Sequence, residues 1–184
     1  CKNELWRHGK KEKMITNYST CLDIILEHEG GFVNHPDDPG GITNHGVTKK
    51  VYDAWVDRET TPREMRDLTH EDVAPIYKKN YWNRAKCDQL PSGVDLSVFD
   101  WAVNSGVSRS AKALQRIVGV EQDGGIGPMT ISAVNDFEPI DIIEKMHYAR
   151  QSFYEKLSTF DTFGNGWTRR NDETKEKALE MMHG

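Results

Sequence analysis

A single interruption in an otherwise continuous series of helix signals limits most strongly what this chain can fold into. The interruption runs from Gly30 to Gly46 and is rich in Gly, Pro and Asp, the residues of tight turns. Short extended pieces lie near its two ends, around residues 32–33 and 42–43, and predict a small hairpin lobe. The sequence therefore predicts a mainly α-helical domain of the α+β type, with a minor β-hairpin.

The predicted helices on either side of the interruption each have one apolar face. In the first helix this face repeats at i, i+3, i+4 and i+7 and consists of Tyr18, Cys21, Leu22 and Ile25. This helix is expected to begin with a cap at Thr16 or Asn17 and to end at Glu29. A second helix is predicted to begin at Thr48, with an inward face of Val51, Tyr52, Trp55 and Val56.

The middle of the chain contains further helix signals. A capping box from Thr69 to Asp72 predicts the start of one helix. Residues 94–103 are apolar on most sides, so this helix is expected to run through the middle of the domain. Ser108 is expected to cap the next helix, which Gly119 ends.

The last third of the chain predicts three more helical segments. Pro128 occupies the first helical position of one segment, before Met129, Ile131 and Val134. A long amphipathic segment follows, with a stripe of Ile140, Ile143, Met146, Phe153, Leu157 and Phe160. A glycine loop from Phe163 to Trp167 is expected to separate it from a charged terminal helix.

Length, charge and cysteine content exclude several classes of protein. The chain has 184 residues and no run of 18 apolar ones, so we expect a protein without a membrane span. Its net charge of −5 disfavours nucleic acid as a partner. Its three cysteines lie far apart, which is typical of neither a disulfide framework nor a zinc ribbon, and Cys21 is expected in the core.

The N-terminal segment is polar and basic. Residues 1–14 are predicted to be poorly ordered and to precede a single domain of residues 15–184. The segment from Cys1 to Lys13 lacks an apolar region and is therefore not a complete signal peptide. Export would then depend on holin-type release of a phage-encoded protein, on a longer N-terminus or on another delivery route.

Glu29 is a candidate catalytic acid because of its phase on the first helix. At 100° per residue it lies within about 40° of the apolar face, whereas Glu27 points the opposite way. Partial burial favours the neutral form of a carboxyl group, which is the form that a general acid needs. Gly30 and Gly31 follow and permit a sharp turn that leaves a cleft beside the carboxyl group.

Asp37 and Asp38 lie on a hydrated turn, where a carboxylate stays ionised. Two carboxyl groups in contrasting environments are what glycoside hydrolysis requires. A helix-end glutamate is nevertheless more often a surface residue, and Asp-Pro-Gly-Gly is usually only a turn. From spacing alone, the sequence therefore indicates no more than a possible hydrolase.

Longer motifs strengthen this interpretation. Residues 29–48 read Glu-Gly-Gly-Phe-Val-Asn-His-Pro-Asp-Asp-Pro-Gly-Gly-Ile-Thr-Asn-His-Gly-Val-Thr, and Tyr81-Trp82, Leu90-Pro91 and the run from Phe99 to Gly106 follow. These segments resemble glycoside hydrolase family 108, muramidases found among phage endolysins. Three later segments resemble the C-terminal peptidoglycan-binding region of such proteins: Ala113-Leu-Gln-Arg, the run from Asp123 to Pro128, and the run from Gly164 to Arg170.

The resemblance implies a lysozyme-like α+β fold and an N-acetylmuramidase. Such an enzyme cleaves the β-1,4 bond between N-acetylmuramic acid and N-acetylglucosamine in the cell wall. It implies a catalytic half of about residues 15–92 and a helical, wall-binding half of about residues 93–184. Glu29 matches the family's acid, Asp38 its loop aspartate and Thr43 its threonine. This order is similar to the Glu-Asp-Thr arrangement of phage-type lysozymes, whose last two residues hold the attacking water, although the gap from Asp38 to Thr43 is one residue shorter here. We expect inversion if the carboxyl groups of Glu29 and Asp38 are about 6.5 to 9.5 Å apart, and retention at about 5 Å.

Other polar and aromatic residues are candidates for binding substrate, with a core or solvated role as the alternative for each. They are Asn44, His45, Tyr81, Trp82, Trp101 and Asn104. Arg169 and Arg170 are candidates for contacting the anionic peptide stems of the wall, or simply begin a solvated helix. The expected partner is peptidoglycan, in the periplasm or outside the cell. The protein is expected to be a monomer and to need no metal or cofactor.

Three alternatives remain at this stage. A zinc peptidase is suggested by His28-Glu29, but the fifth position of an H-E-x-x-H motif is Phe32 here. A non-catalytic wall-binding module has no need of Glu29 on an apolar face. A lytic transglycosylase uses the same glutamate without water and leaves a 1,6-anhydro sugar, and the presence of Asp38 and Thr43 favours hydrolysis instead.

Overall fold

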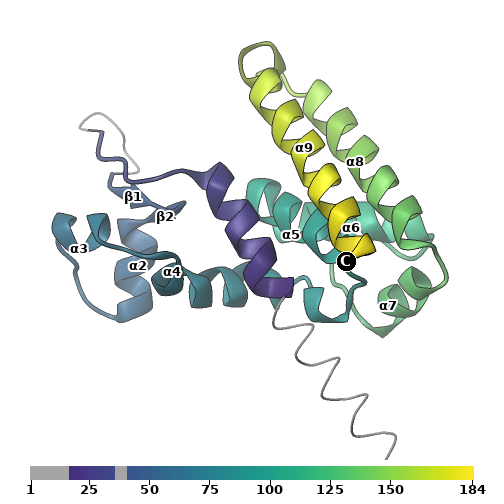
Figure 1. Ribbon diagram of the computed structural model, residues 1–184, viewed down its shortest axis with the longest axis horizontal. Helices are drawn as coiled ribbons and strands as arrows, with labels where there is room; N and C mark the ends of the chain where they lie inside the picture. Colours follow the sequence, from purple (N-terminus) through teal and green to yellow (C-terminus); the bar gives the residue numbers. More distant parts are fainter. Residues whose placement is uncertain (1–16, 36–40) are drawn as a thin grey trace, which may run out of the picture. The chain divides into compact units, whose positions relative to one another are not determined.

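A computed structural model describes residues 17–35 and 41–184 of the chain. The predicted disordered segment 1–14 and the candidate cap Thr16 lie outside these residues. The chain divides into two compact units, Tyr18–Asn80 and Tyr81–Gly184, the second joined by Asn17 (Figure 1). Both units are built mainly of helices, and the described β-structure is a two-stranded sheet in the first unit, which confirms the predicted fold class.

The first unit contains a helix over residues 17–29, a hairpin and three short helices. These elements are β1 (Thr43–Asn44), β2 (Val47–Thr48), α2 (Lys49–Val56), α3 (Pro62–Arg66) and α4 (His70–Tyr77). The helix over residues 17–29 buries the four residues of its predicted apolar face and ends at Glu29 as expected. Cys21 is fully buried there, as predicted.

The hairpin lies slightly later in the chain than the sequence suggested. Strands β1 and β2 are antiparallel, with Thr43 opposite Thr48 and Asn44 opposite Val47. The predicted pairing of residues 32–33 with 42–43 is reduced to one bridge, Val33 with Thr43. The reason is that a two-residue turn between Asn44 and Val47 closes a tighter hairpin than the long Gly/Pro-rich loop can.

Helix α2 begins as predicted but buries less than predicted. Thr48 caps it by accepting a hydrogen bond from Val51 N at 3.2 Å, and the capping box of Thr69 and Asp72 begins α4. The inward face expected for α2 is wrong, because Val51 is 43% exposed and Trp55 is 39% exposed. Helix α2 packs on β2, and the described part of the unit does not cover its outer side. On the partly exposed Trp55, the ammonium group of Lys79 lies 5.5 Å from the centre of the ring.

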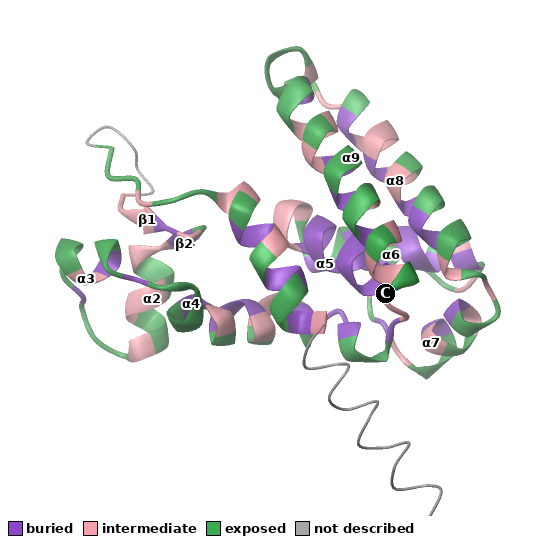
Figure 2. Ribbon diagram, in the orientation of Figure 1, coloured by how far each residue is buried: buried purple, intermediate pink, exposed green. Residues whose placement is uncertain are grey.

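The second unit is organised around one buried helix. Its elements are η2 (Cys87–Gln89), α5 (Val94–Ser105), α6 (Val107–Val118), α7 (Pro128–Asn135), α8 (Pro139–Glu155) and α9 (Phe160–His183), and the π-helix η1 (Lys78–Trp82) spans the boundary between the units. Every residue from Val94 to Ala102 is buried, and α5 packs against α6, α8 and α9 (Figure 2). This confirms the prediction that residues 94–103 run through the middle of a domain.

Two predicted boundaries in this unit are wrong. Ser108 lies inside α6, whose N-terminal cap is Gly106, although Gly119 ends the helix in the left-handed conformation as predicted. The expected glycine loop from Phe163 to Trp167 is part of α9, and the connection from α8 to α9 is residues 156–159. Gly164 serves close packing instead of a turn, because a Cβ atom there would lie 2.6 Å from the Phe160 ring.

A buried ion-pair network joins α5, α8 and α9. The Asp100 carboxylate, at 0% exposure, accepts hydrogen bonds from Arg150 at 2.6 Å, Arg170 at 3.1 Å and Thr174 at 3.0 Å. Burial alone would raise the pKa of Asp100, but the two guanidinium groups outweigh it and hold the pKa below its usual range. Arg170 is therefore a structural residue, which corrects the expectation that it contacts peptide stems.

In the part of the chain that the structure describes, no helix combines the length and the apolar character needed to cross a membrane.

Candidate functional site

Glu29 occupies the last position of the helix over residues 17–29. It is half-buried, whereas Glu27 on the other side of the helix is exposed, as their phases predicted. Gly30 follows with φ of +77°, a left-handed conformation that favours glycine and ends the helix directly after the carboxyl-bearing residue. The local sequence thus places a partly desolvated carboxyl group at a helix end.

The turn between β1 and β2 carries the other half of this site. His45 and Gly46 are its two central residues, with φ of +47° and +74° between the paired residues Asn44 and Val47. Two consecutive positive φ values are the mark of a type I′ turn. A positive φ is unusual for histidine, and strained backbone of this kind is frequent at functional sites.

Gly46 allows this turn to approach Glu29 closely. A Cβ atom at Gly46 would lie 2.9 Å from Glu29 Oε2 and 2.3 Å from the hydroxyl oxygen of Tyr77. The Tyr77 hydroxyl also donates a hydrogen bond to the His45 carbonyl oxygen at 2.8 Å. A carboxyl oxygen and a phenol oxygen are therefore neighbours at a turn that has no side chain between them. We call Glu29, His45, Gly46 and Tyr77 the Glu29 cluster.

Replacing Gly46 by Ala is expected to lower glycan cleavage by about 10²-fold, because the new methyl group would displace the Glu29 carboxyl group by a fraction of an ångström or more. Gly119→Ala is the matched control, since Gly119 has φ of +78° and open space around its Cβ position. Both variants should lose about 1–2 kcal/mol of stability to left-handed strain, and Gly46→Ala should lose more because its Cβ would also overlap the buried Tyr77 side chain. Cleavage rates and thermal unfolding are measured for both variants. Equal activity of the two variants would contradict the proposed packing of Gly46 against Glu29.

The sequence-predicted residues of the hairpin have different surroundings. Thr43 is half-exposed, and its backbone is fixed by paired hydrogen bonds with Val33 at 2.8 and 2.9 Å. Asn44 is buried, and its amide donates to the carbonyl oxygens of Met65 and Arg66 at the end of α3. Since this amide is already used in the core, Asn44 supports the hairpin; this corrects the expectation that it binds substrate.

The His45 side chain is also held in place. Its Nε2 atom donates a hydrogen bond to the Leu68 carbonyl oxygen at 2.9 Å, and its ring meets His70 edge-on at 4.8 Å. His45 as a whole residue is half-exposed. Asp37 and Asp38, the second carboxyl candidates, lie outside the described residues.

The aromatic pair in η1 divides into one core residue and one half-exposed residue. Trp82 is buried, donates from Nε1 to Asp88 at 2.7 Å and meets Phe99 edge-on at 5.1 Å. Its role is structural, which corrects its assignment to substrate binding. Tyr81 is half-exposed, and it lies in a π-helical turn of a kind often found at functional sites.

Trp101 and Asn104 do not form the exposed platform that their spacing suggested. Trp101 is 2% exposed and its ring packs on Phe153 at 6.2 Å. The Asn104 side-chain oxygen accepts hydrogen bonds from the hydroxyl groups of Tyr154 and Ser105. Both residues therefore belong to the packing of the second unit, and the prediction of an open stacking surface is wrong.

The described residues contain no group of three or more His, Cys, Asp or Glu side chains placed to hold a metal ion.

Comparison with known proteins adds independent information. Residues 22–106 match the family described as Glycosyl hydrolase 108, and residues 109–172 match one described as Predicted Peptidoglycan domain. The chain is similar to the solved structure of Brucella abortus SagA, with 40% sequence identity and a TM-score of 0.78; the match covers 91% of this chain and 96% of that chain. No curated protein matches the chain. The first family match includes helix α5, which packs against α6, α8 and α9 of the second unit. The boundary between the two family matches therefore differs from the boundary between the two compact units.

Proposed function

The chain belongs to glycosyl hydrolase family 108, and from this premise we propose that it is an N-acetylmuramidase with Glu29 as its general acid. Its two matched families make it a glycoside hydrolase that acts on peptidoglycan. The bond we assign is the β-1,4 linkage from N-acetylmuramic acid to N-acetylglucosamine. The place of action is then the cell wall, in the periplasm or outside the cell.

The position of Glu29 is the observation that carries this proposal. A catalytic acid needs a carboxyl group that is partly withdrawn from water yet reachable by substrate. Glu29 is half-buried at a helix end and lies against the glycine of a type I′ turn. The packing of this turn limits the rotamers of the carboxyl group, so that its direction is set before substrate binds.

In the proposed reaction the Glu29 carboxyl group donates its proton to the glycosidic oxygen as the bond to the muramic acid carbon breaks. Asp38 and Thr43 hold a water molecule on the opposite face of the sugar, and Asp38 accepts the proton that this water loses. One displacement then inverts the anomeric carbon. Within the Glu29 cluster, Tyr77 acts by positioning, and the half-exposed His45 is a candidate for sugar contacts. Tyr81, which is half-exposed in the other unit, is a separate candidate for binding substrate.

Analysis of the products tests this function. Purified peptidoglycan is digested, and the released fragments are identified by mass spectrometry, with and without a chelator. Reducing N-acetylmuramic acid ends, formed first as the α-anomer and unaffected by chelator, are the expected result. Anhydro ends would identify a lytic transglycosylase, and peptide-bond cleavage or intact glycan would overturn the glycosidase assignment.

A further inference from the structure

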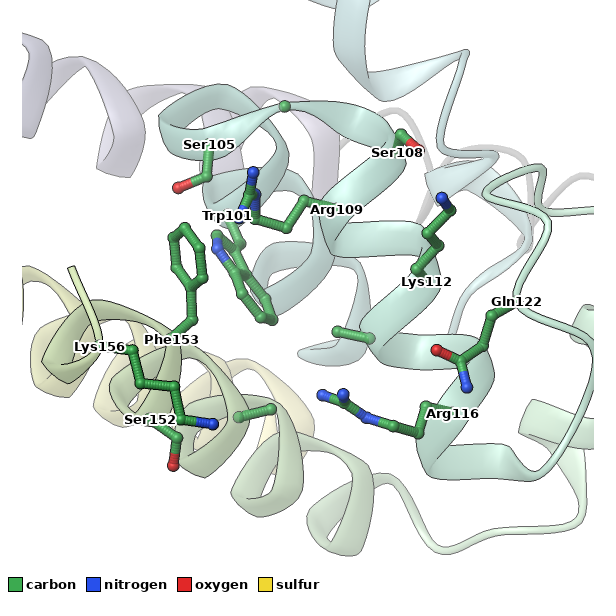
Figure 3. Close-up of a pocket in the computed structure, with 13 residues that line it drawn as sticks. Trp101, Ser105, Ser108, Arg109, Lys112, Arg116, Gln122, Ser152, Phe153 and Lys156 are labelled. Carbon is green, nitrogen blue, oxygen red and sulfur yellow. The ribbon is translucent and has the colours of Figure 1, made fainter.

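The second unit contains a cavity that the proposed catalytic residues do not use. It has a volume of about 560 Å³ and lies between α6 and α8, with Trp101 of α5 at its base (Figure 3). Volumes of this size are typical of small-molecule and peptide-side-chain sites. All of its lining residues belong to this one unit.

Four cations line this cavity, and no carboxylate does. Arg109, Lys112 and Arg116 project from one face of α6 at i, i+3 and i+7, and Lys156 follows the end of α8. None of the four forms an ion pair with another described residue. In a chain of net charge −5, four unneutralised cations around one cavity are a local exception that favours an anionic ligand.

The aromatic residues in the cavity add geometry to this charge. The guanidinium carbon of Arg109 lies 4.1 Å from the centre of the Phe153 ring, a cation–π contact that restricts the position of this side chain. The Trp101 Nε1 atom is buried and has no hydrogen-bond acceptor among the described residues. A buried donor without an acceptor is rare in folded proteins, and this one belongs to a residue that lines the cavity.

A second cavity of about 560 Å³ continues along the same two helices. It shares Arg116 and Lys156 with the first and adds Lys145 and Tyr148, whose ring is 74% exposed. Its one acidic residue, Glu144, is paired with Lys175 at 3.3 Å. We call the two cavities together the basic groove. Its cations come from several positions along α6 and α8, which suits a ligand that carries several separated anionic groups.

We propose that the basic groove binds the carboxylate groups of the peptide stems of peptidoglycan. The inference rests on the proposed action on peptidoglycan. It adds the binding site, which is the basic groove, and the groups that are bound, which are the stem carboxylates. Glycan chains without stems offer few charges, whereas stems carry carboxylates at intervals, which match cations spaced along α6 and α8. A planar guanidinium group pairs with a carboxylate through two parallel hydrogen bonds.

Calorimetric titration of the intact protein with a soluble disaccharide-pentapeptide tests the proposal, because this fragment lacks the bond that a muramidase cleaves. The double variant Arg109→Gln/Arg116→Gln should bind it about 10-fold more weakly while remaining folded, as judged by circular dichroism. Lys177→Gln is the control, since Lys177 is an exposed cation on α9 that pairs with Glu180 at 3.4 Å and lines neither cavity; its affinity should equal wild type. Equal weakening by Lys177→Gln would overturn the site.

Two further probes identify the ligand group. Neutral chitotetraose should not compete with the pentapeptide fragment, and a fragment with amidated carboxyl groups should bind at least 10-fold more weakly. A wall phosphate polymer that binds the groove more tightly than the pentapeptide would overturn the assignment to stems. Cleavage of glycan strands stripped of stems should be equal in wild type and the double variant, which separates a failure of the groove from a failure of the catalytic proposal.

Discussion

Replacing Glu29 by Gln is expected to lower the rate of glycan cleavage by about 10²–10⁴-fold, the contribution typical of a general acid. The amide has almost the same shape as the carboxyl group, so its packing against Gly46 and Tyr77 should survive. It carries no acidic proton for the leaving oxygen, and the loss should therefore appear in kcat. The measurement is the release of reducing ends from purified peptidoglycan.

Glu27→Gln is the control for this experiment. Glu27 is exposed and lies two residues earlier on the same helix, so its variant should cleave at the wild-type rate. The Glu29→Gln protein should still bind the disaccharide-pentapeptide, because the basic groove belongs to the other unit. If Glu29→Gln cleaved as fast as wild type, another residue would have to be the acid.

Replacing Asp100 by Asn is expected to be the most destabilising single change considered, at about 3–5 kcal/mol. The substitution leaves Arg150, which is 2% exposed, buried beside an uncharged group, and it also weakens the hold on Arg170. One Arg150 nitrogen already lacks a partner among the described residues, so little else can compensate. Calorimetry of thermal unfolding measures the loss.

The dependence on pH distinguishes this ion pair from a simple packing defect. The pKa of Asp100 is lower in the folded protein than in the unfolded chain, so the stability it contributes is complete above about pH 4 to 5 and is lost as pH falls further. The difference in free energy of unfolding between wild type and Asp100→Asn should therefore become smaller below pH 4. A difference that stays constant from pH 7 to pH 3 would contradict the electrostatic explanation.

Glu144→Gln serves as the comparison, because it breaks an exposed pair with Lys175 in the same unit. Its cost should be no more than about 0.5 kcal/mol, since solvent screens such pairs. A similar loss in both variants would indicate that burial is not what makes the Asp100 network important.

The features predicted correctly from the sequence are mostly local or periodic. The cap at Thr48, the capping box at Thr69 and the end of α6 at Gly119 depend on residues within one turn of the helix terminus. The burial of residues 94–102 follows from a helix that is apolar on most sides, and the half-burial of Glu29 follows from its helical phase. The wrong inward face of α2 has a tertiary cause, because periodicity shows which side is apolar but not whether another element covers it.

Chain order and side-chain chemistry by themselves determined a mainly helical protein, a small hairpin and Glu29 as the candidate acid. Only the tertiary structure decided which partners these residues meet. Tyr77 reaches the turn at Gly46 from 31 positions further along the chain, and Arg150 and Arg170 reach Asp100 from helices α8 and α9. The cations of α6 become a groove only when α8 brings Lys156 and Phe153 beside them. Such contacts depend on packing between distant segments, which no local pattern in the sequence encodes.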